Sequence, residues 1–112
     1  MLCKKQALFA QNVAKLIQYC AAIGKPCTLG EAFRTKEQAE IYAASGKGIK
    51  NSKHCERLAI DLNLFNGEYT YHPEAEFYKE AGEYWKTLHA QNRWGGDWKS
   101  GDANHFQMLN SD

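Results

Sequence analysis

The sequence predicts an α+β fold, in which about three helices pack around a small antiparallel sheet. Three observations lead to this prediction. Apolar residues recur with a helical period over residues 4–23. Helix-start signals precede residues 36–44 and 73–88, and residues 58–65 alternate with the period of a strand.

Each helix has a recognisable start or end. Gly24 stops the first helix, and Pro26 follows just beyond it. The second helix is expected to start after Thr35, which forms a capping box with Gln38. Pro73 suits the first turn of the third helix, because its fixed backbone angle is already helical.

The predicted strands are short and separated by polar segments. Residues 58–65 give the clearest strand, with four aliphatic side chains on one face: Leu58, Ile60, Leu62 and Leu64. Residues 27–33 and 104–109 also have the composition of extended segments. We expect loops over residues 45–52 and 93–101, where glycine and polar residues are frequent.

The composition is that of one ordinary domain over residues 1–112. Of the 112 residues, 44% are hydrophobic and 24% are charged, and the formal net charge is +1. This charge gives no electrostatic reason to expect a nucleic-acid partner. No apolar run approaches the ~18 residues of a membrane span. We therefore expect a monomer with no nucleic-acid partner and no membrane insertion.

The N-terminal segment and the cysteines indicate the compartment. Polar residues interrupt the first apolar stretch, which indicates an amphipathic helix and not a signal-peptide core. The chain is therefore expected to be cytoplasmic, and its cysteines to be free thiols. These cysteines are Cys3, Cys20, Cys27 and Cys55.

A single carboxylate interrupts the apolar strand. Asp61 lies on the face opposite the aliphatic side chains, and its burial is costly unless it is paired or binds a metal. His54 precedes it at the end of a polar loop, and His105 lies in the last strand-like segment. Two imidazoles and one carboxylate make a catalytic zinc set that leaves a fourth position for water.

Asp102 and Arg34 are candidates for completing a hydrolytic site. Zinc lowers the pKa of water toward ~7, and a nearby carboxylate must then carry the proton to the leaving amine. Asp102 stands three residues before His105 and suits this role. Arg34 could stabilise the oxyanion or anchor a substrate carboxylate. Each residue alone also has an ordinary structural explanation, so spacing does not settle these roles.

Three segments resemble the zinc D-alanyl-D-alanine carboxypeptidase and L-alanyl-D-glutamate endopeptidase family, which includes phage endolysins and vancomycin-resistance D,D-peptidases. The segments are GEAFRTKEQAEIYA (residues 30–43), SKHCERLAID (residues 52–61) and GDANHFQ (residues 101–107). The resemblance implies the fold shared by D,D-peptidases and Hedgehog signalling domains. It also implies peptidoglycan stem peptides as substrates, which the enzyme reaches only when it is released, for example by a holin-type helper.

The resemblance assigns a role to each matched residue. It implies that His54, Asp61 and His105 bind zinc and that Asp102 is the general base and acid. Arg34 matches the arginine of the active site. Ser52 matches the serine beside the first ligand, and a supporting role is expected for it. The chain departs from many members at Arg57, where they have glycine, and in having Asp102 where some branches have glutamate.

Several alternatives stay open at this point. The enzyme could cut the L-alanyl-D-glutamate bond as endolysins do, or it could remove terminal D-alanine as a carboxypeptidase. The chain could instead be a non-catalytic, zinc-stabilised module that binds the cell wall. Cys55 adjoins His54 but should point away from it on an extended chain, which argues against a cysteine nucleophile. Trp94 and Trp98 could line a substrate groove or pack in the core.

Overall fold

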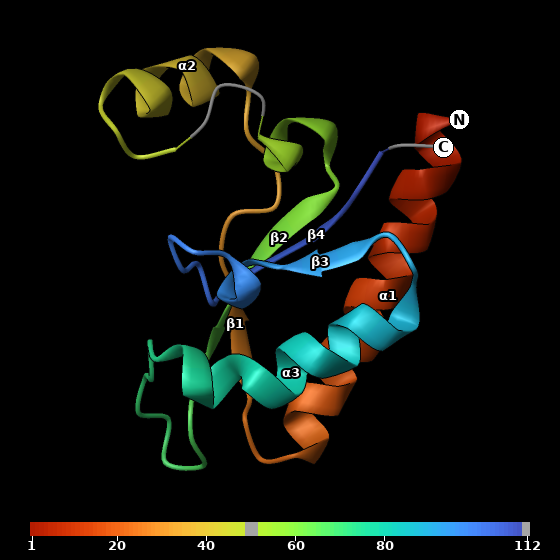
Figure 1. Cartoon of the computed structure of the whole chain (residues 1–112). Helices are drawn as coiled ribbons and strands as arrows, with labels where there is room; N and C mark the ends of the chain where they lie inside the picture. The colour runs from red at the N-terminus through yellow and green to blue at the C-terminus, as the bar shows by residue number, and fades with distance from the viewer. Residues whose placement is uncertain (49–51, 111–112) are drawn as a thin grey trace.

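A four-stranded antiparallel sheet occupies the centre of the fold in the part of the chain that is described, residues 1–48 and 52–110 of the computed structural model (Figure 1). Its strands are β1 (Cys27–Leu29), β2 (Ala59–Leu64), β3 (Asn92–Trp94) and β4 (His105–Met108). They lie in the order β1-β2-β4-β3, so the first and last strands along the sheet are its edges. The predicted α+β fold is confirmed.

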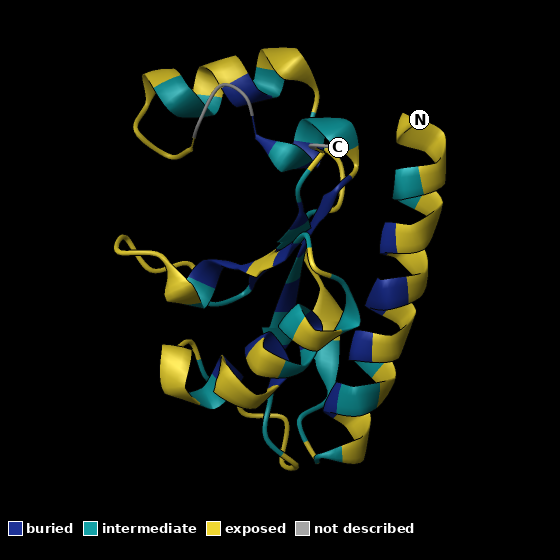
Figure 2. Ribbon diagram, turned by 45° about the vertical axis from the view of Figure 1, so that its right-hand side comes forward, coloured by how far each residue is buried: buried dark blue, intermediate teal, exposed yellow. Residues whose placement is uncertain are grey.

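The same described ranges contain three α-helices: α1 (Leu2–Ala22), α2 (Lys36–Ala44) and α3 (Ala75–Leu88). α1 and α3 pack against each other and against the sheet, whereas α2 stands apart at one end of it (Figure 1). The buried stripe of α1 faces the sheet (Figure 2). The largest fully buried side chains include Trp85, Tyr78, Phe106 and Leu16.

Local signals in the sequence explain where α2 begins and where α1 ends. Thr35 caps α2, because its hydroxyl accepts a hydrogen bond from the amide of Gln38 at 3.0 Å. α1 ends where Gly24 adopts a φ of +77°, a left-handed conformation that favours glycine. The amides of Gly24 and Lys25 then bond back to the carbonyls of Ala21 and Cys20, as in a Schellman motif.

Some predicted boundaries were wrong. The segment 93–101 was expected to be a loop, but it begins inside strand β3 and continues in a 3-10 turn, Gly95–Asp97. Three residues are too few to show a strand period, and pairing with β4 alone makes this segment a strand. The 3-10 turn Lys53–Glu56 was likewise not expected. α3 begins at Ala75, two residues later than predicted.

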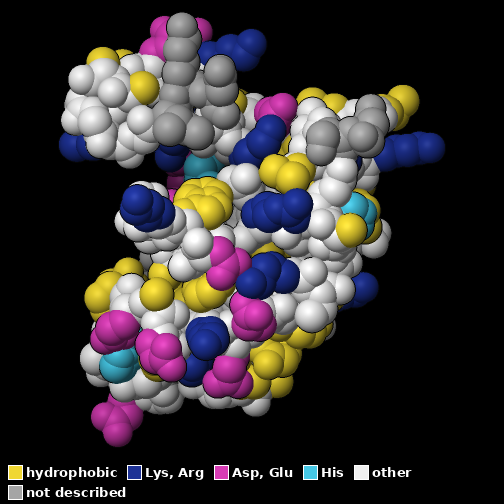
Figure 3. Space-filling view, viewed as in Figure 1, with side chains coloured by type: hydrophobic (Ala, Val, Ile, Leu, Met, Phe, Trp, Pro, Cys, Tyr) yellow, Lys and Arg dark blue, Asp and Glu magenta, His cyan; other side chains and the backbone are white. Residues whose placement is uncertain are grey.

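The surface shows no dominant charge. Acidic and basic side chains are mixed on the face that Figure 3 shows, and a notch separates the α2 region from the rest of the molecule. A histidine is visible inside this notch. In the described ranges, every helix is too short or too polar to cross a membrane.

Candidate metal centre

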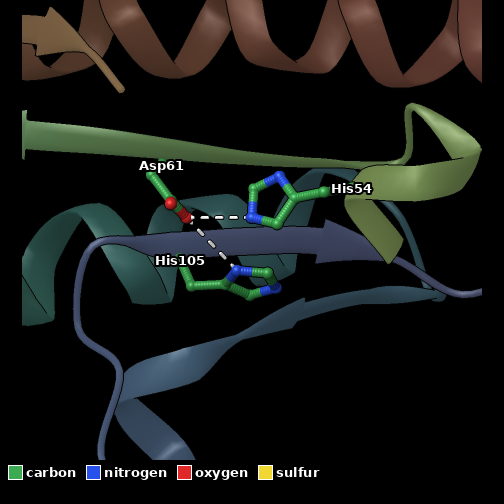
Figure 4. Close-up of side chains that lie close together, drawn as sticks. All are labelled: His54, Asp61 and His105. Atoms are coloured by element: carbon green, nitrogen blue, oxygen red, sulfur yellow. Dashed lines mark hydrogen bonds and ion pairs between the residues drawn. The ribbon is translucent and has the colours of Figure 1, made fainter. Parts of the chain in front are cut away.

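The fold brings His54, Asp61 and His105 together. Oδ1 of Asp61 lies 3.2 Å from Nε2 of His54 and 3.3 Å from Nδ1 of His105 (Figure 4). The two imidazole rings meet edge to face, with their centroids 5.0 Å apart. Both histidines are buried, at 2% and 6% exposure, so one carboxylate oxygen is shared between two desolvated imidazoles.

Strand pairing sets one half of this cluster. Asp61 and His105 are direct partners in the antiparallel register of β2 and β4, so their side chains leave the same face of the sheet. The alternation predicted for residues 58–65 is present, since Leu62 and Leu64 are fully buried while Asp61 is partly exposed.

A short turn sets the other half. His54 lies in the 3-10 turn Lys53–Glu56, and the hydroxyl of Ser52 accepts a hydrogen bond from the His54 amide at 3.2 Å. Ser52 thus fixes the backbone of His54 and does not touch its imidazole through this bond. Arg57 ends the turn with φ 56° and ψ 36°, which is the left-handed conformation. Glycine adopts the left-handed conformation most easily, which is a physical reason for the glycine that many members of the family have at the position of Arg57.

A bulge beside Asp61 brings a further carboxylate to the site. The amide of Gly30 donates to the Asp61 carbonyl at 2.7 Å, and the Asp61 amide donates to the Glu31 carbonyl at 2.9 Å. Two residues therefore face one, as in a β-bulge, which redirects side chains near active sites. An added Cβ at Gly30 would lie 3.0 Å from Cβ of Asp61, so only glycine allows this approach without a shift.

Glu31 joins Arg34 to the cluster. Oε1 of Glu31 forms an ion pair with the Arg34 guanidinium and lies 3.8 Å from Nε2 of His54. The Arg34 guanidinium also stacks over Tyr42, 4.8 Å from its ring centroid. Arg34 is mostly buried, and its Nε has no partner among the described residues. Arg34 is therefore held beside the cluster, with a buried N–H that lacks a hydrogen bond among these residues.

Asp102 lies at the open side of the cluster. Its Oδ2 is 3.8 Å from Nδ1 of His105, and its side chain is 48% exposed. Its amide donates to the carbonyl of Gly95, and its own carbonyl accepts from the amide of His105, both at 3.0 Å. A Cβ at Gly95 would overlap the carbonyl oxygen of Asp102, so a residue with a side chain would not fit at position 95 without a shift of the backbone.

The pKa values of the acidic groups differ in direction. Burial opposes the charged form of Asp61, but hydrogen bonds from His105 and His54 outweigh it and lower its pKa to about 2. Burial raises the pKa of Asp102, and the charge of Asp61 adds to this effect. Burial opposes the charged form of His105, but its bonds to Asp61 and Gln107 raise the pKa overall. Asp61 is thus a fixed anion, while Asp102 holds a proton more readily.

The two tryptophans have different positions. Trp98 is 38% exposed, and its ring centroid is 5.0 Å from that of His105, so it borders the site. Trp94 is only 4% exposed and its indole donates to the carbonyl of Ala103 at 2.7 Å. The suggestion that Trp94 lines a groove was wrong, because Gly82 and Gly96 leave room for its ring in the core.

The thiol of Cys55 turns away from the cluster. Its sulfur lies 3.8 Å from the carbonyl oxygen of Thr35. The expected reason was wrong, since Cys55 and His54 lie in a 3-10 turn and not on an extended chain. Arg57 lies over the ring of Phe33 at 4.1 Å, and both line a mostly apolar pocket of about 350 Å³ beneath α1.

Glu31 and Gln107 were not selected from the sequence. The amide oxygen Oε1 of Gln107 lies 2.8 Å from Nε2 of His105 and can accept a hydrogen bond from it. Its position two residues after His105 in a strand was a usable signal, because such residues share one face. Glu31 had no comparable signal, since the bulge that redirects it depends on pairing with a distant strand.

The donor set fits a zinc ion. A tetrahedral ion with bonds near 2.05 Å has ligand atoms about 3.3 Å apart. The two distances from Asp61 to the imidazole nitrogens match this edge. The three ligand atoms all lie within 4.8 Å of one another, which is close enough for one ion to be shared. Two neutral nitrogens and one carboxylate also match zinc's ligand preference.

Comparison with known proteins agrees with this geometry. A sequence profile of the D-alanyl-D-alanine carboxypeptidase family matches residues 45–108, which include His54, Asp61, Asp102 and His105. The crystal structure of the Serratia marcescens L-Ala D-Glu endopeptidase ChiX is similar, with a TM-score of 0.70 and 19% identity. This match covers 88% of the present chain and 79% of that one. No curated protein matches in sequence. Because the profile spans more than half of the chain, the protein belongs to the D-alanyl-D-alanine carboxypeptidase family and is a peptidoglycan peptidase.

Proposed function

We propose that this peptidase is zinc-dependent and hydrolyses peptide bonds in peptidoglycan stem peptides. The observation that carries the proposal is the position of Asp61, whose Oδ1 is shared by the nitrogens of His54 and His105 at zinc-ligand spacing. A zinc ion held there would polarise the scissile carbonyl and make water a stronger nucleophile at neutral pH. The remaining steps fall to side chains of the chain itself.

Asp102 is proposed to move the proton. Its carboxylate is close enough to His105 to reach a water at the cluster, yet it is too far away to be drawn in as a ligand without movement. Its raised pKa suits a group that accepts a proton from water and then delivers it to the leaving amine.

Arg34 is proposed to stabilise negative charge on the substrate. The Arg34 side chain is largely shielded from water, where a cation acts more strongly on a developing oxyanion. Glu31 holds this cation in place and partly neutralises it in the free protein. Trp98 is proposed to form a wall for the substrate, since it is exposed beside His105.

The alternative without catalysis remains testable. A structural zinc site does not need a proton acceptor at its open side, and Asp102 stands there. We therefore favour the enzyme over a zinc-stabilised module that only binds the wall.

The deciding experiment combines metal analysis with digestion of muropeptides. Zinc-loaded protein should shorten a pentapeptide muropeptide, and mass spectrometry would show which bond is cut. Release of D-alanine alone would identify a carboxypeptidase, whereas release of the stem from its first L-alanine would identify an L-alanyl-D-glutamate endopeptidase. Stoichiometric zinc with neither product would support the binding module and overturn our proposal.

Asp102→Asn tests the proposed chemistry. The variant should bind zinc as the parent protein does, while kcat falls about 10²–10⁴-fold, which is the usual contribution of general acid–base catalysis. Asp97→Asn is a suitable control, because Asp97 is exposed and bonds to Lys86. Full activity in Asp102→Asn would contradict the assigned role.

A further inference from the structure

We propose that Gln107 is a positioning residue that selects the tautomer of His105. Its amide oxygen would accept the Nε2–H of the imidazole, so that the lone pair of Nδ1 faces the metal position. This inference rests on the proposed zinc site and assigns a role to a residue outside the ligand set.

The geometry for this role is direct. Nε2 of His105 lies 2.8 Å from Oε1 of Gln107, while Nδ1 of the same ring lies 3.3 Å from Oδ1 of Asp61. Both residues belong to β4 and leave the same face of the strand. The two ring nitrogens of His105 therefore have separate partners, one toward the proposed metal and one away from it.

Elementary chemistry fixes the direction of the bond. A neutral imidazole has one N–H donor and one acceptor nitrogen. If Nδ1 is to bind a cation, the proton must be on Nε2, and that N–H needs an acceptor because His105 is only 6% exposed. The Gln107 amide oxygen supplies this acceptor. The opposite tautomer would place a proton between Nδ1 and Asp61 and would block the metal.

The backbone of Gln107 is itself anchored. Its carbonyl accepts from the buried indole of Trp85 at 3.1 Å, and the same indole donates to the carbonyl of Arg93 at 3.0 Å. Trp85 thus bridges β3 and β4 at the level of Gln107. This restraint fixes the backbone from which the Gln107 side chain reaches His105.

His54 has no such partner. Its Nδ1 is buried and has no hydrogen bond with any residue in the ranges 1–48 and 52–110. Orientation by a side-chain amide is therefore specific to the His105 half of the site among the described residues. The contact with a side-chain amide therefore distinguishes His105 from His54.

The test uses Gln107→Met, which removes the acceptor at similar size, and Gln107→Glu, which keeps one. Competition with a chromophoric chelator should show a 10- to 100-fold weaker zinc affinity for Gln107→Met, the usual cost of losing such a partner. Gln107→Glu should stay within about threefold of the parent protein, because its carboxylate still accepts the same proton. Gln18→Met, an exposed change on α1, is the matched control and should leave affinity unchanged.

Nitrogen-15 NMR of the histidine side chains gives a readout that does not depend on activity. In the zinc-loaded parent protein the metal should be on Nδ1 of His105 and the proton on Nε2. Zinc on Nε2, with the proton on Nδ1, would overturn the inference, even if Gln107→Met failed to fold.

The remaining outcomes are also decisive. Unchanged zinc affinity in a folded Gln107→Met variant would overturn the inference, and so would a raised KM at saturating zinc, which would indicate contact with substrate. Restoration of kcat by excess zinc would support it. If the parent protein bound no zinc, the proposed function would fail, while the Nε2–H of the protonated His105 ring in metal-free protein would still show whether Gln107 accepts its hydrogen bond.

Discussion

The two histidines of the cluster are held in different ways. His105 is part of the sheet, paired with Asp61 across two strands and bonded to Gln107 on its far side. His54 belongs to a short 3-10 turn, where Ser52 accepts from its amide and the amides of Arg34 and Arg57 donate to its carbonyl. The register of two strands thus fixes one half of the site, and the local bonds of a turn fix the other.

This difference indicates how the site is prepared for a ligand. The Asp61–His105 half is determined by the register of β2 and β4, so it can change only if the sheet changes. The His54 half lies on a turn outside the sheet, so its position does not depend on the register of two strands. We therefore expect the sheet half to define the position of the metal and the turn half to close on it.

The largest expected effect comes from removing the oxygen that both halves share. Asp61→Asn should abolish zinc binding at micromolar metal and reduce peptidase activity to background, because a neutral amide neither attracts the cation nor orients both imidazoles. Metal analysis after dialysis and a muropeptide assay would measure this. Zinc retained at one equivalent would show that the two histidines suffice, and would contradict the assignment of Asp61.

A smaller effect is expected from acid in the metal-free protein. The pKa of Asp61 is lowered from 3.8 to about 2, so its contribution to stability is present above pH 3.8 and is lost as the pH falls toward 2. This contribution is about 2 kcal/mol. Asp102 acts in the opposite sense, since its raised pKa favours folding at low pH and this benefit is lost as the pH rises. The raised pKa of His105 adds stability below pH 6.5 that is lost as the pH rises through its folded value.

Urea unfolding after chelation would measure the effect of acid. The stability difference between the parent protein and Asp61→Asn should shrink by about 2 kcal/mol between pH 5 and pH 2. Hydrogen bonds from His105 and His54, and the charges of both rings, lower the pKa of Asp61. His105→Ala and His54→Ala should therefore each reduce this acid dependence, and an unchanged dependence in either variant would contradict the sharing of Asp61 by the two halves.

The smallest effect should come from the cap on the turn half. Ser52→Ala removes the acceptor of the His54 amide and should cost about 1 kcal/mol of unfolding free energy. Zinc affinity should fall less than tenfold, since the His54 ring itself remains. Thr35→Ala is the matched control, because it removes the similar cap of α2. Its loss of stability without loss of zinc affinity would show that the Ser52 cap acts locally on the site.

Much of the fold could be predicted because local signals decide it. The alternation of residues 58–65, the cap at Thr35 and the stop at Gly24 each act within a few residues. β3 could not be predicted, because it becomes a strand only by pairing with β4. The burial of Trp94 could not be predicted for a related reason. It depends on the glycines at positions 82 and 96, which lie on other elements.

The site shows the same division between local and distant information. The cluster of His54, Asp61 and His105 could be proposed from residue types together with the family resemblance, and the fold brings the three side chains together. Glu31 could not, because it reaches the site through a bulge whose partner is thirty residues away in sequence, at Asp61. Chemistry that depends on tertiary pairing is thus less visible in a sequence than chemistry carried by the ligands.

The site depends on Gly30 and Gly95 as well as on its reactive groups. A Cβ at Gly30 would lie 3.0 Å from Cβ of Asp61, and a Cβ at Gly95 would overlap the carbonyl oxygen of Asp102. A side chain at either glycine would therefore displace the residue that carries the acid, and it would do so whichever acid stands there. A protein engineer who transplants this centre to another scaffold has to carry the two glycines along with the acids.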